Sequence, residues 1–186
     1  MKFIKFLLII FISINSPVKA DSNQNLINEL KQGGKLIFIR HAYAPGGGDP
    51  ASFLLDDCNT QRNLNQQGID QSYVIGEIFR NYQVPIDQVL SSQWCRCMDT
   101  AKYAFDELEA WSALNSTFSG TFKKNHSKQI LQLKQFLSDW EDDRGNLILV
   151  THYIIIAGAL NYYPASGEIV IANKNLEVLG NIKTKF

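Results

Sequence analysis

Two apolar runs in this sequence end in residues that could do chemistry. Residues 36–39 are followed directly by Arg40 and His41, and residues 147–150 lead through a threonine into His152. In an open α/β sheet, the crevice beyond the carboxyl ends of the strands is the usual place for a ligand. A guanidinium group can hold a phosphate there, and an imidazole can act as a nucleophile or a base. The two strand ends therefore predict an anion site with histidine chemistry.

A third element supplies another cation. Arg96 lies in the first turns of a helix expected over residues 93–108, just after a serine pair suited to cap it. A helix N-terminus favours an anion, and an arginine there adds a planar fork for phosphate oxygens. The alternative is a helix-surface arginine paired with Asp99 or Thr100. If Arg96 instead meets the two strand ends, the site can transfer a phosphoryl group to histidine.

Apolar periodicity and loop-forming residues predict the elements that position these side chains. Helices are expected at residues 24–32, 65–82, 93–108, 126–140 and 153–160. Strands are expected at residues 35–40, 88–91, 147–150, 168–172 and 176–179, and the stretch 44–57, rich in glycine and proline, must be a loop. This alternation indicates an α/β fold, a three-layer sandwich whose mostly parallel central sheet is flanked by helices. The polar segment 114–125 would form a small lid and leave the site open.

The first twenty residues are unlike the rest. Two lysines precede an apolar stretch at residues 6–14, and a small-residue exit ends at Ala20. Residues 1–20 are therefore predicted to be a signal peptide. A retained membrane anchor is the alternative, but a spanning helix needs about 20 apolar residues. Residues 21–186 suit one domain, exported across the inner membrane to the periplasm without a stable membrane span.

The charge pattern argues against a nucleic-acid partner. The chain has 18 Lys+Arg and 18 Asp+Glu residues, and three of the lysines lie in the predicted leader. The remaining basic residues are scattered, whereas a nucleic-acid binder normally shows clustered lysine and arginine.

The three cysteines predict one disulfide and one free thiol. Export would place Cys58, Cys95 and Cys97 in an oxidising compartment. Cys95 and Cys97 point to different faces of a helix and cannot bond each other comfortably. We therefore expect Cys58 to pair with Cys95 or with Cys97, and the spacing does not choose between them. A metal site is not expected, because there is no CxxC motif and no second histidine at ligand spacing.

Several motifs together resemble the histidine phosphatase superfamily. They are Arg40-His41, Ser91-Ser92 with Arg96, Thr100 and Ala101, Thr151-His152, and the connecting Leu64-Asn65-x-x-Gly68-x-x-Gln71. The resemblance spans residues 35–160 in the right order. More narrowly, the chain is similar to an exported small branch that includes periplasmic lipopolysaccharide-core phosphatases.

The resemblance implies roles for these residues. His41 would be the catalytic nucleophile, phosphorylated in the first half-reaction, while Arg40, Arg96 and His152 hold the phosphoryl oxygens. No metal or cofactor is implied, because the cations neutralise the transferred group. The expected partner is a phosphorylated small molecule, a glycan phosphate or a lipopolysaccharide phosphate. Arg62 is a further candidate for substrate binding, and the alternative is a salt bridge to Asp56 or Asp57.

The pattern departs from the family at the proton donor. A leaving oxygen needs a general acid unless it is already a good leaving group. The segment 111–116, where many members carry a glutamate, has no carboxylate, and Tyr153 stands where others carry an aspartate. Ala42 also replaces the family's glycine. Two functions stay open: a periplasmic phosphatase that hydrolyses a phosphomonoester through a phosphohistidine intermediate on His41, and a phosphate-binding pseudoenzyme that lacks an efficient general acid.

Overall fold

The centre of the protein is a six-stranded sheet built on two buried strands. The computed structural model describes residues 22–118, 120–141 and 145–185, so the predicted signal peptide 1–20 lies outside the described residues. The strands are β1 (Leu36–Arg40), β2 (Ile86–Ser91), β3 (Glu109–Ala110), β4 (Asn146–Thr151), β5 (Ile169–Ala172) and β6 (Val178–Ile182). Their order is β3-β2-β4-β1-β5-β6. The first four strands in this order run parallel, and β5 and β6 pair antiparallel at one edge. The predicted mostly parallel sheet is confirmed.

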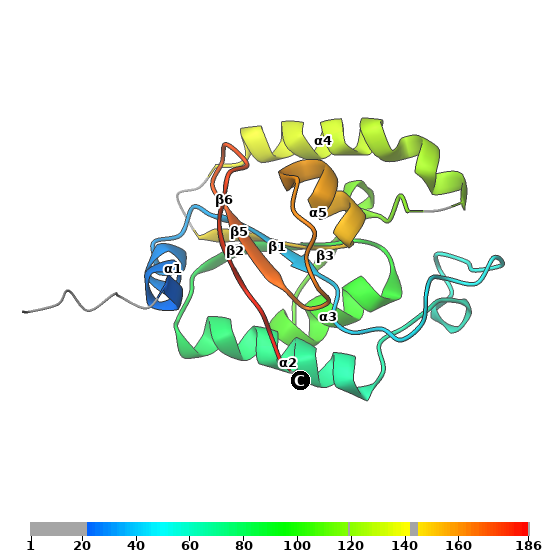
Figure 1. The fold of residues 1–186 in the computed structure, drawn as a ribbon, viewed down its shortest axis with the longest axis horizontal. Coiled ribbons are helices and arrows are strands. Elements are labelled where there is room, and N and C mark those ends of the chain that lie inside the picture. Colours follow the sequence, from blue (N-terminus) through cyan, green and yellow to red (C-terminus); the bar gives the residue numbers. More distant parts are fainter. Residues whose placement is uncertain (1–21, 119, 142–144, 186) are drawn as a thin grey trace, which may run out of the picture.

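Helices cover both faces of this sheet (Figure 1). One layer holds α1 (Ser22–Lys31), α2 (Gln66–Asn81) and α3 (Cys95–Phe105). The other layer holds α4 (His126–Asp139) and α5 (Tyr153–Leu160). The predicted three-layer sandwich is therefore the observed architecture, with the sheet as its middle layer.

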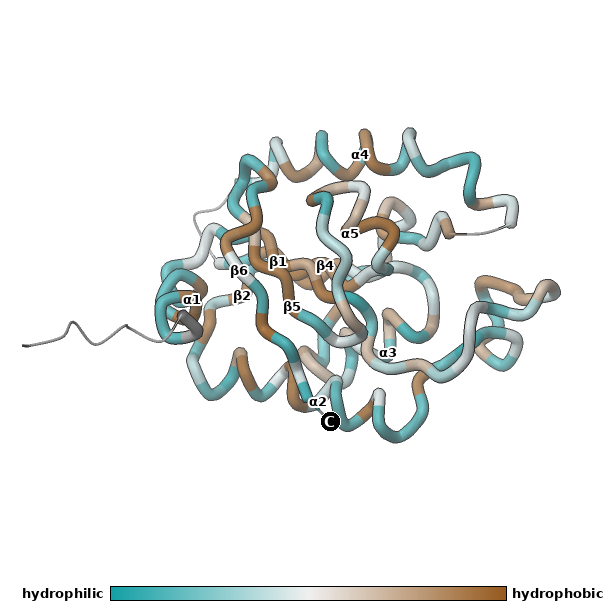
Figure 2. The backbone as a smooth tube through the Cα atoms, viewed as in Figure 1, coloured by the Kyte–Doolittle hydropathy of each residue, from teal (hydrophilic) through white to brown (hydrophobic). Residues whose placement is uncertain are grey.

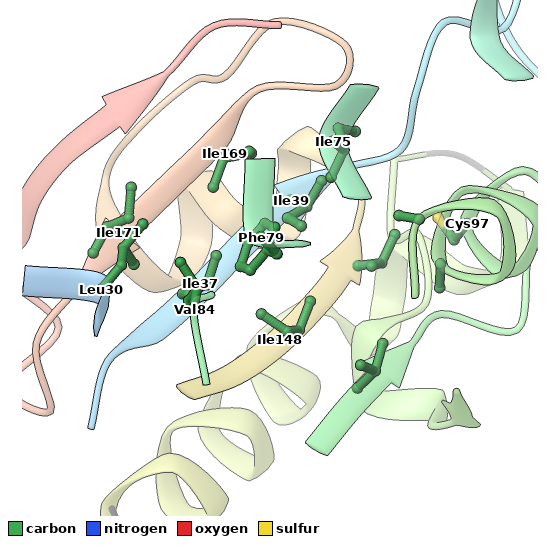
Figure 3. Packing of buried hydrophobic residues seen from close by; sticks show 14 of the residues in the cluster. Leu30, Ile37, Ile39, Ile75, Phe79, Val84, Cys97, Ile148, Ile169 and Ile171 are labelled. Carbon is green, nitrogen blue, oxygen red and sulfur yellow. The ribbon is translucent and has the colours of Figure 1, made fainter. Parts of the chain in front are cut away.

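Side-chain alternation along the strands explains the two cores. Ile37 and Ile39 on β1 face the layer of α1, α2 and α3, where Figure 3 shows them among other aliphatic side chains. Leu36 and Phe38 face the layer of α4 and α5. Successive residues of a strand point to opposite faces, so a strand buried on both sides must be apolar throughout. The hydropathy colouring in Figure 2 shows brown along the central strands and on α5, whereas α2 and α4 carry many hydrophilic residues.

Three local features differ from the sequence-based expectations. The helix after β2 begins at Cys95, with Trp94 as its N-cap and no capping side chain, so the serines do not cap it as expected. Strand β3 was not expected, because two residues are too few for a periodic pattern. Two short 3₁₀ turns, which were not expected, lie at Ser112–Leu114, at the start of the lid segment, and at Gly120–Asn125 within it.

None of the helices in the part of the chain that the structure describes is long and apolar enough to cross a membrane.

Candidate active site

The strand ends bring the two predicted histidines together. Because β1 and β4 are adjacent and parallel, with Arg40 level with Thr151, the residues that follow them emerge side by side. The rings of His41 and His152 lie with their centroids 5.5 Å apart and nearly edge to face. Both side chains are almost completely buried. The sheet register, rather than any local motif, sets this pairing.

A cavity of about 160 Å³ opens at this edge. It is lined by residues from six separate stretches of the chain, namely Arg40, His41, Gly46, Gly47, Gly48, Asp49, Arg62, Arg96, Ser116, Phe118, His152 and Tyr153. All four side chains predicted for catalysis and phosphate binding line it, and so does Arg62. The lid contributes Ser116 and Phe118, as the expected position of the lid implies.

The three arginines of the cavity carry unused donors. The buried Nε atoms of Arg40, Arg62 and Arg96 have no hydrogen-bond partner among the described residues. The Nη1 atoms of two of these guanidinium groups do have partners. Nη1 of Arg40 donates to the carbonyl of Pro164 at 3.0 Å, and Nη1 of Arg62 donates to the carbonyl of Ala44. Buried donors without partners are costly unless a ligand completes them. Three such donors around one cavity indicate a site for an oxyanion.

His41 is held as a neutral imidazole with one nitrogen free for chemistry. Its Nδ1 lies 2.8 Å from the carbonyl oxygen of Ala42, which can only accept, so Nδ1 carries the proton and Nε2 the lone pair. Burial, together with the charges of Arg96 and Arg40, holds the pKa of His41 well below its ordinary value. The ring is therefore unprotonated at neutral pH, as a nucleophile must be.

His152 is placed by side chains, not by the backbone. Its Nε2 lies 3.0 Å from Oγ of Ser92 and 3.4 Å from Sγ of Cys97. The indole ring of Trp94 packs edge-on against the imidazole at 5.4 Å. Burial lowers the pKa of His152 well below its ordinary value, and the positive charge of Arg96 adds to this effect.

The remaining motif residues fix the backbone just after His41. The amide of Ala42 donates to Oγ1 of Thr100 at 2.9 Å, and the amide of Tyr43 donates to Oε1 of Gln71 at 2.8 Å. Gly68 lies so close that a Cβ would stand 2.0 Å from the carbonyl oxygen of Tyr43. These residues fix the backbone next to His41 and are not among the residues that line the cavity. The methyl group of Ala42 is completely buried.

Arg96 makes a contact that the sequence analysis did not foresee. Its guanidinium pairs with the carboxylate of Asp49, with Nη1 at 2.7 Å from Oδ1 and Nη2 at 3.1 Å from Oδ2. The alternative of a surface arginine paired with Asp99 or Thr100 is wrong, because Arg96 is 3% exposed and faces the cavity. Asp49 was missed because it lies in the irregular loop 44–57. The one available signal was an acid directly after three glycines.

Arg62 also lies at the cavity. Its guanidinium contacts the carbonyl of Ala44, and its backbone amide donates to Oδ1 of Asp49 at 3.1 Å. The salt bridges among the described residues join Lys35 to Glu29 and Arg96 to Asp49, so the alternative bridge from Arg62 to Asp56 or Asp57 is not formed. Burial and the charge of Arg96 lower the pKa of Arg62 from its ordinary value.

A disulfide fastens the loop that carries Asp49 and Arg62. Cys58 is bonded to Cys95, which is next to Arg96 on α3. Cys97 is free and buried, and burial raises the pKa of its thiol to about 12. The amide of Cys95 also donates to Oε1 of Gln61 at 3.1 Å. The predicted disulfide is confirmed, and the structure selects Cys95 over Cys97.

The cavity lining contains one carboxylate, that of Asp49. Burial tends to raise the pKa of Asp49, but hydrogen bonds and the charge of Arg96 outweigh it and hold this pKa below its ordinary value. Asp49 is therefore an anion at neutral pH and cannot donate a proton to a leaving group. Among the described residues, the lining offers no other carboxylate for this role.

Comparisons with known proteins agree with this architecture. The family model of the histidine phosphatase superfamily (branch 1) matches residues 36–151. The chain belongs to the histidine phosphatase superfamily. No curated protein matches the chain in sequence.

Solved structures share the fold at low sequence identity. A structure of the protein histidine phosphatase SixA complexed with tungstate is 15% identical, with a TM-score of 0.51, and the match covers 82% of this chain and 94% of that one. The crystal structure of TTHB049 from Thermus thermophilus is 16% identical, with a TM-score of 0.57, covering 80% of this chain and 98% of that one. At these identities the likeness shows the fold.

Proposed function

We propose that the protein is a phosphatase that hydrolyses a phosphorylated substrate through a phosphohistidine intermediate on His41. One observation carries the proposal. A neutral imidazole with an unprotonated Nε2 lines the same small cavity as the three arginines whose Nε atoms have no partner among the described residues. Membership of the superfamily supports phosphatase chemistry. The roles given to Arg40, Arg96 and His152 as phosphate ligands are part of this proposal.

The first half-reaction follows from these positions. Nε2 of His41 attacks phosphorus, the bond from phosphorus to the leaving group breaks, and the electron pair of that bond goes to the leaving group. Arg40, Arg96 and His152 hold the oxygens of the transferred group, and the two arginines stabilise the charge that spreads over them. Arg62, which lines the same cavity, is a further donor to these oxygens. In the second half-reaction water attacks phosphorus, the N–P bond breaks, and inorganic phosphate and neutral His41 are restored. Each step conserves atoms and electron pairs.

The leaving group is the part of the reaction that this site assists least. Asp49 is held as an anion by Arg96, and the cavity lining has no second carboxylate among the described residues. We therefore favour substrates whose leaving group needs little protonation, such as N-phosphoryl, acyl or aryl phosphates. The structural likeness to SixA, a protein histidine phosphatase, is consistent with this class. The broader expectation of a small-molecule, glycan or lipopolysaccharide phosphate fits this site where the phosphoryl group is attached to such a leaving group.

The same missing acid favours a second function, a phosphate-binding pseudoenzyme. Such a protein would keep the arginines and histidines of the cavity and bind phosphate without catalysing a reaction.

We also propose that the protein works in the periplasm. The sequence of residues 1–20 and the Cys58–Cys95 disulfide support export, because disulfides persist in oxidising compartments.

Trapping the phosphoenzyme separates the two functions. The full-length protein is mixed with labelled acetyl phosphate, quenched rapidly at neutral to alkaline pH, and analysed for covalent label. We expect an acid-labile label on the wild-type protein and none on His41→Ala, because the nucleophile is missing. As a control, His126→Ala should keep the label, since His126 contacts Thr117 in the lid and does not line the cavity. Phosphate binding without any label on the wild type would establish the pseudoenzyme instead.

A further inference from the structure

The guanidinium of Arg96 has five N–H donors, and their partners can be counted. Nη1 and Nη2 meet Asp49 along the outer edge of the group, and Nη1 also donates to the carbonyl of Arg62 at 3.2 Å. Nε has no partner among the described residues. The two donors not accounted for are the Nε–H and the second hydrogen of Nη2, which lie parallel on one edge. That edge has the geometry for two oxygens of one phosphate.

Asp49 is fixed from several directions. Besides Arg96, its carboxylate accepts hydrogen bonds from the backbone amide of Arg62 at 3.1 Å and from the indole Nε1 of Trp94 at 3.0 Å. A carboxylate offers about four lone-pair sites, so these four bonds use its capacity. The preceding Gly46 has a φ of +98°, which favours glycine and helps the loop turn back toward α3.

We propose that Asp49 is a positioning residue for the phosphate site: it holds the outer edge of the Arg96 guanidinium so that the Nε–Nη2 edge faces the bound phosphoryl group. The inference rests on the proposed function and deepens it. Asp49 touches no reacting atom and stays bonded to Arg96 while phosphate is bound. In the competing arrangement, the Asp49 carboxylate occupies Arg96 only in the absence of phosphate, and bound phosphate displaces the carboxylate from Arg96.

The two arrangements predict opposite effects of Asp49→Asn. The amide group of asparagine would place N–H donors opposite the N–H donors of Arg96 or Trp94. These donors cannot hydrogen-bond each other, so the Arg96 guanidinium would rotate out of its position. We expect kcat/KM for acetyl phosphate to fall on the order of tenfold to a hundredfold, because misplaced groups at a reacting centre cost rates of this size. We also expect the inhibition constant for inorganic phosphate to rise. An unchanged or higher kcat/KM with tighter phosphate binding would overturn the proposal.

Asp56→Asn is the matched control, because Asp56 lies exposed in the same loop and carries the same charge. We expect it to leave kcat/KM and phosphate binding near the wild-type values. A double variant tests whether Asp49 affects kcat/KM through its contact with Arg96. In an Arg96→Ala background, Asp49→Asn should cost little more, since neighbours that act through one contact are not additive. Full additivity would show that Asp49 acts elsewhere and would overturn the proposal.

A measurement on the wild-type protein covers the case in which Asp49→Asn does not fold. The Trp94 indole proton reports on the carboxylate directly, and the Trp140 indole, bonded to Asp87 at 3.1 Å far along the chain, is its internal reference. We expect hydrogen exchange at the Trp94 indole to be as slow in the protein saturated with inorganic phosphate as it is in the phosphate-free protein. Faster exchange at Trp94 alone would show that phosphate displaces Asp49. Because this readout needs phosphate binding but not turnover, it separates failure of the inference from failure of the phosphatase proposal.

Discussion

The two ends of the central parallel strands treat buried polar groups in opposite ways. At the amino ends of β1 and β4, the side chain of Asn146 is completely buried, and both its nitrogen and its oxygen are hydrogen-bonded. Its Nδ2 donates to the carbonyls of Leu30 at 2.8 Å and Pro85 at 2.7 Å, and its Oδ1 accepts from the amide of Lys35 at 3.1 Å. At the carboxyl ends, three arginine Nε atoms are buried without a partner among the described residues.

This difference separates stability from function within one sheet. A satisfied buried network rigidifies the fold, whereas unsatisfied buried donors raise the free energy of the empty protein and mark where a ligand would bind. Natural proteins retain such costs at functional sites. We therefore expect substitutions at the carboxyl ends to reduce activity with little loss of stability, and substitutions at the amino ends to do the reverse.

The largest effect should come from Arg40→Ala. Removing one donor that stabilises the charge of the transition state typically lowers the rate by about a hundredfold to a thousandfold, and we expect kcat/KM to fall by that factor. The free energy of unfolding should change by no more than about 1 kcal/mol, because the lost bond to Pro164 is offset by removal of a buried cation. Activity assays and urea denaturation measure the two quantities.

Arg80→Ala is the matched control for Arg40→Ala. Arg80 also donates from Nη1 to a backbone carbonyl, that of Ala104 at 2.9 Å, but it is exposed on α2 and outside the cavity. Its replacement should leave kcat/KM unchanged. A large loss of stability in Arg40→Ala, with activity preserved in the folded fraction, would reverse the comparison between the two ends.

Asn146→Ala tests the opposite end. The substitution removes three hydrogen bonds, namely those to the Lys35 amide and to the carbonyls of Leu30 and Pro85, and we expect it to lower the free energy of unfolding by roughly 3 kcal/mol. The kcat/KM of the folded protein should stay within about twofold of the wild type. Asn28→Ala, at an exposed position on α1 that accepts from Gln24 at 3.3 Å, should cost far less. A specific loss of activity in Asn146→Ala would show that the ends are not independent.

The buried strands and the residues that follow them were predictable from the sequence. A fully apolar run such as 147–150 is typical of a buried parallel strand, and a histidine at the end of such a run must emerge at the sheet edge. The family motifs then indicated which strand ends would meet. Helix α5, apolar throughout, has the bounds that the sequence predicted, Tyr153–Leu160.

The contacts made by the long loop were not predictable in this way. Loop 44–57 has no hydrophobic period, and an acid directly after three glycines does not by itself indicate that Asp49 turns back onto Arg96. The choice of Cys95 over Cys97 depends on which face of α3 meets this loop, and a spacing of two residues does not reveal it. Both failures have the same cause: an irregular loop is placed by its tertiary contacts, and these are absent from local patterns.

The smallest expected effect is the pH dependence of stability at the carboxyl end. The pKa values of His41 and His152 lie well below the ordinary value in the folded protein, because of burial and the nearby arginines. Below about pH 6.5 these two histidines are therefore protonated in the unfolded chain but stay neutral in the folded protein. Because the unfolded state binds more protons, the free energy of unfolding falls as the pH falls. Between about pH 7.5 and 5.5, each such histidine should lower it by roughly 1.4 kcal/mol.

Two variants test whether this fall in the free energy of unfolding comes from the carboxyl ends of the strands. His41→Gln should lose about 1.4 kcal/mol less than the wild type over the same pH interval, because one of the two titrating groups is gone. Asn146→Ala keeps both histidines and should show the wild-type pH dependence from a lower starting stability. Urea denaturation at each pH gives these values. Equal pH dependence in His41→Gln and the wild type would mean that His41 accepts a proton in the folded state, and the cavity would then not hold the neutral nucleophile that the proposed reaction needs.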